Sequence, residues 1–142
     1  MKLQRSVETT ATPAQVFTYL SDFTNTNDWD PGTVRTELVS GDGGVGTTYH
    51  NVSSFMGRET ELTYVVQTHQ PDRLFALRGE NDTVTAHDSM EISPVGAGSR
   101  VTYTADFAFK GVTKYLAPLL APAFKKLGDE AEKGLREALA AL

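Results

Sequence analysis

The C-terminal third of the chain combines an alternating strand with a long amphipathic helix. Arg100–Phe109 alternates apolar and polar side chains, which is typical of a half-buried strand, and Lys110-Gly111 ends the alternation. From Val112 to Leu142 apolar residues recur at spacings of three and four, which predicts a helix with one apolar face. The stripe consists of Leu116, Leu120, Ala123, Phe124, Leu127, Ala131, Gly134, Leu135, Ala138 and Leu142. A helix of about 30 residues is about 45 Å long, so it needs a large concave surface to cover that face.

Two prolines, Pro118 and Pro122, fall inside this helical pattern. Each removes a backbone donor and crowds the preceding turn, which predicts a break between Gly111 and Pro122. The main helix is then expected to begin at about Pro118. Val112–Ala117 becomes a separate lead-in segment.

Upstream, the pattern predicts one strand, two short helices and six further strands. The first strand is Leu3–Thr9. A helix begins at Thr12-Pro13, because Thr caps helices and Pro suits their first turn, and a second helical turn covers Thr24–Trp29. The later strands are Thr33–Ser40, Thr47–Phe55, Arg58–His69, Arg73–Gly79, Thr83–Ile92 and Arg100–Phe109. Short turns between them indicate an antiparallel meander. Residues 1–142 are therefore expected to form a single α+β domain.

The composition of the chain argues against some kinds of binding partner. The net charge of −5 argues against nucleic acid, whose phosphates require basic patches. The most apolar window, Tyr115–Phe124, is short and contains two prolines, so no stable membrane insertion is expected. No apolar leader is seen at the N-terminus, which favours a cytoplasmic protein.

Metal and cofactor chemistry has little support in the sequence. The chain has no cysteine, and its histidines, at 50, 69 and 87, fall on three different predicted strands without metal-ligand spacing. The segment Gly41–Gly46 fits a dinucleotide-binding glycine pattern, but a strand rather than a helix follows it. We therefore expect no metal and no cofactor.

A series of short motifs, in order along nearly the whole chain, resembles the START-like or helix-grip superfamily. That superfamily includes birch-pollen allergen relatives and the polyketide cyclase/dehydrase and lipid-transport proteins. The motifs are residues 11–17 with Leu20 and Asp22, Trp29-Asp30-Pro31, residues 44–47, Val66 with Pro71-Asp72-Arg73, residues 98–103, Lys110-Gly111 and Pro118-Leu119. The resemblance implies a seven-stranded curved antiparallel sheet wrapped around the C-terminal helix, with two short helices after the first strand. It also implies a hydrophobic cavity between sheet and helix, and no single reaction.

Polar residues on inward-facing strand positions are the candidates for chemistry. Asp88 shares one face of its strand with Val84, Ala86, Met90 and Ile92. Two interpretations are open: a polar anchor or general acid/base inside the cavity, or a carboxylate near the sheet edge that is paired with an arginine or with the backbone. The candidate catalytic residues are Asp88, Tyr64 and Arg58. The expected ligand-binding residues are Leu62, Tyr64, Phe75, Leu77, Val84, Asp88, Met90, Tyr103, Phe107, Leu116, Leu120 and Phe124. Neither face of Thr47–Phe55 is clearly apolar, so its inward face stays unassigned.

Three functions remain open at this point. The first is binding, transport or sequestration of a hydrophobic or amphipathic small molecule such as a lipid, fatty acyl or polyketide-like compound by a monomer or homodimer. The second is a cofactor-independent cyclase, aromatase or dehydrase that uses polar cavity residues for proton transfer. The third is a protein–protein module, which a broad exposed apolar patch on the long helix would favour. For ligand entry, Phe55, Met56 and Val112–Ala117 are expected to form a mobile entrance.

Overall fold

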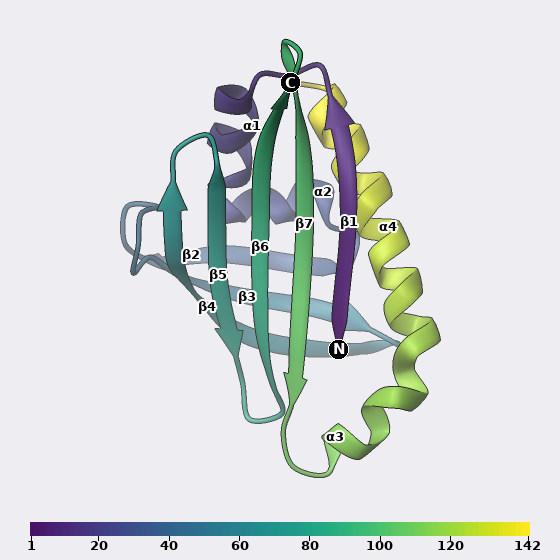
Figure 1. Cartoon of the computed structure of the whole chain (residues 1–142). Coiled ribbons are helices and arrows are strands. Elements are labelled where there is room, and N and C mark those ends of the chain that lie inside the picture. Colours follow the sequence, from purple (N-terminus) through teal and green to yellow (C-terminus); the bar gives the residue numbers. More distant parts are fainter.

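The computed structural model describes residues 1–142 and shows seven strands and a C-terminal helix in the predicted order (Figure 1). The strands are β1 Lys2–Thr9, β2 Thr33–Ser40, β3 Thr48–Phe55, β4 Arg58–Gln70, β5 Leu74–Glu80, β6 Val84–Val95 and β7 Gly98–Phe109. The helices are α1 Pro13–Leu20, η1 Phe23–Asn25, α2 Thr26–Trp29, α3 Thr113–Leu116, η2 Ala117–Leu120 and α4 Ala121–Ala140, where η1 and η2 are 3₁₀ helices. No helix is both long and apolar enough to cross a bilayer.

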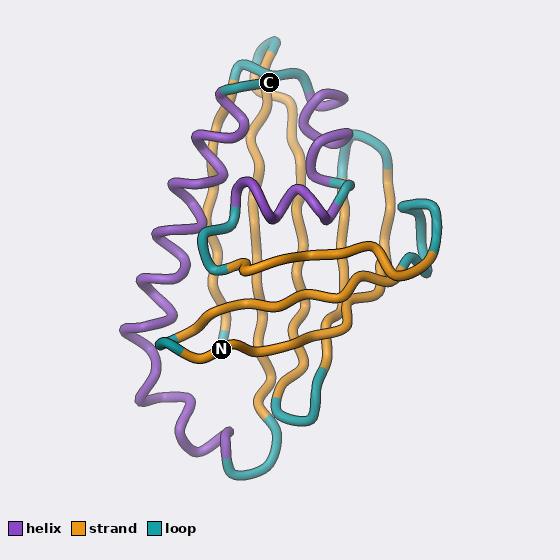
Figure 2. The backbone as a smooth tube through the Cα atoms, turned by 180° about the vertical axis from the view of Figure 1, so that it is seen from behind, coloured by secondary structure: helices purple, strands orange, loops and turns teal.

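All strands belong to one antiparallel sheet in the order β1-β7-β6-β5-β4-β3-β2. The sheet curves so strongly that β2, β3 and the first part of β4 cross the direction of β5, β6, β7 and β1, whereas the last part of β4 bends to lie alongside β5 (Figure 2). Helices α1, α2 and α4 lie on the concave side, and α4 runs beside β1 (Figures 1 and 2). The predicted α+β helix-grip architecture is confirmed.

Helix α1 fills one end of the concave side. Thr12 caps it through a capping box with Gln15, and Pro13 occupies the first turn, as the sequence predicts. Val16, Phe17 and Leu20 are buried in the main core, together with Phe23 and the sheet residues Phe75, Leu77 and Met90. This end of the molecule is therefore solid.

The C-terminal helix is broken where the prolines predict, but it begins later than expected. The segment from Val112 forms α3 and the 3₁₀ turn η2 before α4 starts at Ala121 rather than at about Pro118. Both Pro118 and Pro122 sit in the first turn of a new helical segment, where a missing backbone donor costs nothing.

Strand boundaries differ most at the β6–β7 hairpin. β6 continues to Val95 rather than ending at Ile92, and β7 begins at Gly98, because Pro94 pairs with Ser99 and the turn is only Gly96-Ala97. The inward face of β3 is also resolved. Tyr49 pairs with the buried Tyr64 of β4, so the odd-numbered residues of β3 face the concave side.

Helix α4 approaches the turn after α2 at a glycine. A Cβ added to Gly134 would overlap the carbonyl oxygen of Trp29 and contact Pro31. Ala131, one turn before Gly134, and Leu135, the residue directly after it, are buried in the main core. The absence of a side chain at position 134 thus sets how closely the helix packs.

We expect Gly134→Ala to destabilise the fold, although alanine is the better helix former by about 1 kcal/mol. The added methyl group must displace either the helix or the Trp29 backbone, and such overpacking costs about 1–3 kcal/mol. Urea denaturation measures the change, with Lys133→Ala on the exposed face of the same turn as the control. An equal or higher stability for Gly134→Ala would show that this contact is not limiting.

Candidate functional site

A cavity of about 300 Å³ lies between the concave face of the sheet and α4. This volume is at the lower end of the range for small-molecule sites, about 300–1,000 Å³. Its walls come from β1, β3, β4, β6, β7, the η2 turn and the N-terminal half of α4. The lining residues are Leu3, Asp30, Gly32, Ser53, Ser54, Phe55, Thr60, Leu62, Tyr64, Thr83, Val84, Asp88, Tyr103, Ala105, Phe107, Phe109, Thr113, Leu120, Phe124, Leu127, Gly128 and Ala131.

The structure brings together eight of the twelve ligand-binding residues named from the sequence. These are Leu62, Tyr64, Val84, Asp88, Tyr103, Phe107, Leu120 and Phe124. Phe75, Leu77 and Met90 share the concave face but are packed into the solid core beneath α1 and do not line the cavity. Leu116 lies in α3 with 53% of its surface exposed, and Arg58 is exposed at the start of β4 outside the lining.

Asp30 is a lining residue with an ionisable side chain that was not predicted from the sequence. It stands in the Asp30-Pro31-Gly32 turn, which suggested only the end of a helix. Its carboxylate accepts hydrogen bonds from the Gly32 N–H at 3.0 Å and the Thr33 hydroxyl at 3.1 Å. The available signal was its place beside Trp29 in one of the quoted motifs.

Asp88 and Tyr103 form the polar end of the cavity. Asp88, in the middle of β6, is only 7% exposed, and its Oδ2 accepts a hydrogen bond from the Tyr103 hydroxyl at 3.3 Å. The other oxygen, Oδ1, is buried without any hydrogen-bond partner. Trp29 packs edge-on against the Tyr103 ring at 5.5 Å, which fixes that side chain. The site thus contains a rigid carboxyl group with one free acceptor.

The environment shifts the acid–base behaviour of this group. Burial and, to a smaller extent, the charge of Asp30 raise the pKa of Asp88, the Tyr103 hydrogen bond lowers it, and the net result is a pKa of about 7. Burial likewise raises the pKa of Asp30. Burial and the two carboxylates raise the pKa of Tyr64 and of Tyr103 well above the usual value for a phenol. Both hydroxyls therefore stay protonated near neutral pH and can donate hydrogen bonds.

Tyr64 is held in place by its neighbours on the sheet. It pairs with Gly79 of β5, and its ring lies where a side chain at position 79 would stand. The Phe23 ring contacts it from η1 at 4.9 Å between centroids. Tyr64 is 6% exposed, and the structure gives its hydroxyl no internal hydrogen bond. This position makes its hydroxyl available to a molecule in the cavity.

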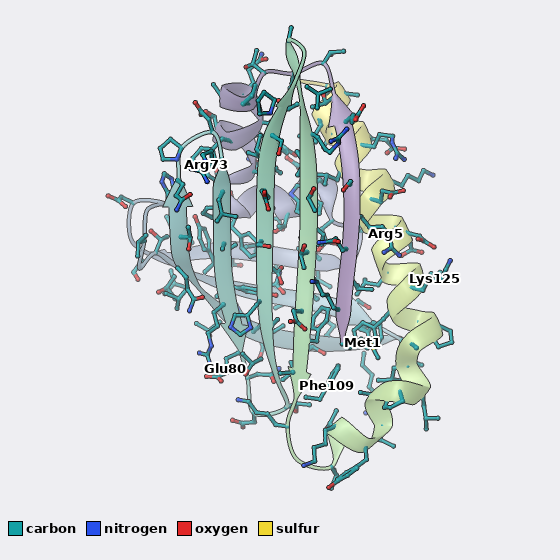
Figure 3. The ribbon with its side chains drawn as sticks, in the orientation of Figure 1. Met1, Arg5, Arg73, Glu80, Phe109 and Lys125 are labelled. Carbon is teal, nitrogen blue, oxygen red and sulfur yellow. The ribbon has the colours of Figure 1, made fainter.

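The end of the cavity away from Asp88 is aromatic. Phe124 of α4 lies between three phenylalanines, with ring centroids 4.7 Å from Phe55, 5.2 Å from Phe107 and 5.7 Å from Phe109. Phe109 is at the lower end of β7, directly above the turn into α3 (Figure 3). The phenylalanines thus gather at the end of the cavity away from the two carboxyl groups.

The lead-in segment and the β3–β4 turn expose apolar side chains next to this aromatic end. Val112, Tyr115 and Leu119 are each more than 70% exposed, and Met56 is 66% exposed. Lys110 anchors the start of the segment, because its ammonium group donates to Glu80 and to the Asn81 carbonyl. Mobility of this entrance remains a prediction. These exposed apolar side chains belong to the lead-in, to η2 and to the β3–β4 turn rather than to α4.

The raised pKa of Asp88 predicts a pH-dependent stability. The folded state holds the proton more tightly than the unfolded chain, whose Asp has a pKa of about 3.9. The stabilising contribution is complete below about pH 4 and is lost as the pH rises to about 7, at about 1.4 kcal/mol per pH unit. Asp88→Asn should therefore gain stability relative to the native chain over this window and keep the gain at higher pH.

Urea denaturation at pH 5, 6, 7 and 8, roughly spanning this window, measures that difference. Asp82→Asn, in the exposed β5–β6 turn, controls for the loss of one negative charge. A stability difference between Asp88→Asn and the native chain that stays constant with pH would contradict the prediction.

Comparisons with known proteins agree with this architecture. Residues 1–141 match the family described as polyketide cyclase / dehydrase and lipid transport, whereas no curated protein sequence matches the chain. Many solved structures share its fold at low sequence identity, and three of them are described below. The Zhui aromatase/cyclase from Streptomyces sp. R1128 has a TM-score of 0.82 at 15% identity, covering 98% of this chain and 93% of that one. TTHA0849 from Thermus thermophilus has a TM-score of 0.81 at 18% identity, covering 98% and 97%.

The third is a START superfamily protein from Mycobacterium smegmatis, with a TM-score of 0.71 at 14% identity, covering 97% and 96%. These identities establish a common fold and nothing more specific, while the family match spans nearly the whole sequence. The chain therefore belongs to the polyketide cyclase / dehydrase and lipid transport family.

Proposed function

We propose that this protein binds a hydrophobic or amphipathic small molecule in the cavity between the sheet and α4. The observation that carries the proposal is an internal space with apolar walls and a buried carboxyl oxygen that has no partner within the protein. A buried acceptor left unpaired costs about 1–3 kcal/mol, and a hydrogen bond from a bound molecule removes that cost. The family description, which includes lipid transport, supports the same function.

The shape of the site favours an amphipathic ligand. A polar group would lie near Asp88, Tyr64 and Tyr103, and an apolar body would extend toward Phe107 and Phe124. The walls are mostly fixed by sheet pairing, so the binding surface is largely preformed. Such preorganisation reduces the entropic cost of binding.

Blocking the cavity should abolish binding without unfolding the protein. Thr60 lines the cavity near the start of β4, whereas the adjacent Glu59 is exposed. We expect Thr60→Trp to weaken binding of the neutral fluorophore N-phenyl-1-naphthylamine by about tenfold or more, because the indole occupies the ligand's space. The control Glu59→Trp should bind as the native chain does.

Fluorescence titration measures both affinities, and circular dichroism verifies that both variants are folded. Native mass spectrometry of the purified protein would identify a co-purified ligand. If the native chain does not bind the fluorophore, or if both tryptophan variants bind it equally well, the cavity is not a binding site of the proposed kind.

A second candidate function is acid–base catalysis in the same cavity. Its specific support is the carboxyl group of Asp88, whose pKa of about 7 lets it both accept and release a proton near neutral pH. Tyr64, whose hydroxyl has no partner within the protein, would donate a hydrogen bond to a carbonyl oxygen as negative charge develops on it, while Tyr103 keeps its hydrogen bond to Asp88. One neighbour of the same fold is described as an aromatase/cyclase, and proton removal beside a carbonyl is the elementary step of such chemistry.

This candidate predicts exchange of the acidic C1 protons of 2-tetralone in D₂O. Asp88 would remove a proton to give the enolate, and deuterium would return to the same carbon. Proton NMR should show exchange above the buffer rate with the native chain and with Asp106→Asn on the outer face, and loss of that excess with Asp88→Asn. Exchange by the native chain at the buffer rate, despite binding of the ketone, would leave binding alone as the function.

A further inference from the structure

The cavity has an unbalanced charge. Among its 22 lining residues are two acids, Asp30 and Asp88, and there is no lysine, arginine or histidine. The two carboxyl groups are close enough that the charge of Asp30 raises the pKa of Asp88. An anionic ligand placed here would add a third negative charge to a poorly solvated space. A cationic ligand would reduce the repulsion instead.

The cations nearest to the site do not correct this imbalance. Arg5 lies on the concave side opposite Tyr103 in the β1–β7 register, but it packs against Gly128 and its guanidinium binds Asp129 at 3.0 Å. Lys110 is bound to Glu80 at 2.9 Å. Arg58 is exposed at the start of β4 and does not line the cavity.

Asp88 supplies a second observation, independent of the charge count. Its side chain is more than nine-tenths buried, and Oδ1 has no hydrogen-bond partner. The Tyr103 hydroxyl already occupies Oδ2. When Asp88 is ionised, the partner that Oδ1 lacks is a hydrogen-bond donor, and Asp88 is one of the residues that line the cavity.

The walls around the two acids suit a cation as well. Tyr64 and Tyr103 flank the polar end, and Phe55, Phe107 and Phe124 are among the residues that line the rest of the cavity. Aromatic faces attract ammonium groups, by about 2 kcal/mol or more when the pair is desolvated. The same rings accommodate an aryl or alkyl tail.

We propose that the ligand is a cationic amphiphile, namely an aliphatic ammonium group on an aryl or alkyl tail, whose N–H donates to Asp88 Oδ1. The proposal rests on the proposed binding function and narrows its ligand class. It excludes free fatty acids and other carboxylates as preferred ligands. The tail extends from Asp88 toward Phe124, and Asp30 supplies a second negative charge on the same side.

The proposal carries a pH dependence of known sign. The titratable groups facing Asp88 are Asp30 from the turn after α2, Tyr64 from β4 and Tyr103 from β7, whereas α4 presents only uncharged residues to the cavity. An ammonium group binds the ionised carboxylate, so its affinity increases as the pH passes through the Asp88 pKa of about 7. A neutral ligand gains nothing from that ionisation.

The test compares three probes with one tail: 6-phenylhexylamine, 6-phenylhexanol and 6-phenylhexanoate. Isothermal titration at pH 8 in about 0.5 M NaCl, which screens surface charge, should give the amine an affinity about tenfold or more above the alcohol and further above the carboxylate. From pH 6 to pH 8 the amine should gain about tenfold, since the ionised fraction of Asp88 increases by that factor.

Two variants assign the effect to Asp88. Asp88→Asn should lose both the preference for the amine over 6-phenylhexanol and the pH dependence of amine binding. Asp106→Asn, on the exposed outer face of β7, should keep both. The pH series on the native chain tests the same point if Asp88→Asn does not fold.

The outcomes separate this inference from the function on which it rests. If the alcohol binds and the amine binds no better, or if the amine preference survives in Asp88→Asn, the cationic ligand class is wrong and the binding function stands. If the carboxylate binds most tightly, the ligand class is also wrong. If none of the three probes binds, both proposals fail.

Discussion

The cavity exists because α4 meets the curved sheet tightly at one end and loosely at the other. Near its C-terminus, Gly134 lies against the Trp29 carbonyl, and Leu135 and Leu139 enter the main core. Near its N-terminus the helix presents Leu120 and Phe124, which line the cavity instead. A strongly curved sheet leaves more space on its concave side than one helix can fill. The close contact at Gly134 therefore decides that the remaining space lies under the N-terminal half of α4.

The same contact positions the polar groups of the site. Trp29 touches α4 through its carbonyl and Tyr103 through its ring, and the next residue is Asp30. The Asp30 carboxylate is fixed by its own turn, through Gly32 and Thr33. Movement of the helix at Gly134 would thus be transmitted to the groups that control the ionisation of Asp88. Packing and electrostatics are coupled at this turn.

Much of the fold could be predicted from the sequence because strand periodicity and turn residues are local properties. Alternation along β6 correctly placed Asp88 on the apolar face, and the prolines located the break before α4. Alternation identifies the face of a strand but not the depth at which a residue lies under the covering helices. Phe75 and Met90 lie on the inward face of their strands, as predicted, yet α1 covers them. No pattern in the strands indicates where α1 packs.

Other parts of the site could not be predicted because they depend on the curvature of the sheet. Asp30 belongs to a turn, so strand alternation says nothing about where it points, and it reaches the cavity because the preceding Trp29 packs against α4 and Tyr103 of β7. The inward face of β3 was ambiguous because its buried residues include Asn51, which is satisfied by Thr36 and Ser53 rather than by apolar burial. When buried polar side chains hydrogen-bond to one another in this way, both faces of a strand look partly polar in the sequence.

The carboxyl group of Asp88 is the one feature that opposes stability while it defines the site. An apolar residue at this position, between Leu77 and Ala105 in the sheet, would remove an unpaired buried oxygen and a disfavoured charge. The fold tolerates the Asp88 carboxyl group because the cavity walls hold their shape through backbone pairing in the sheet and through the α4 contact. Neither of these uses the Asp88 side chain. The energetic cost is therefore confined to the cavity, where a bound molecule can offset it. A residue that destabilises an otherwise well-packed fold is expected at a functional site.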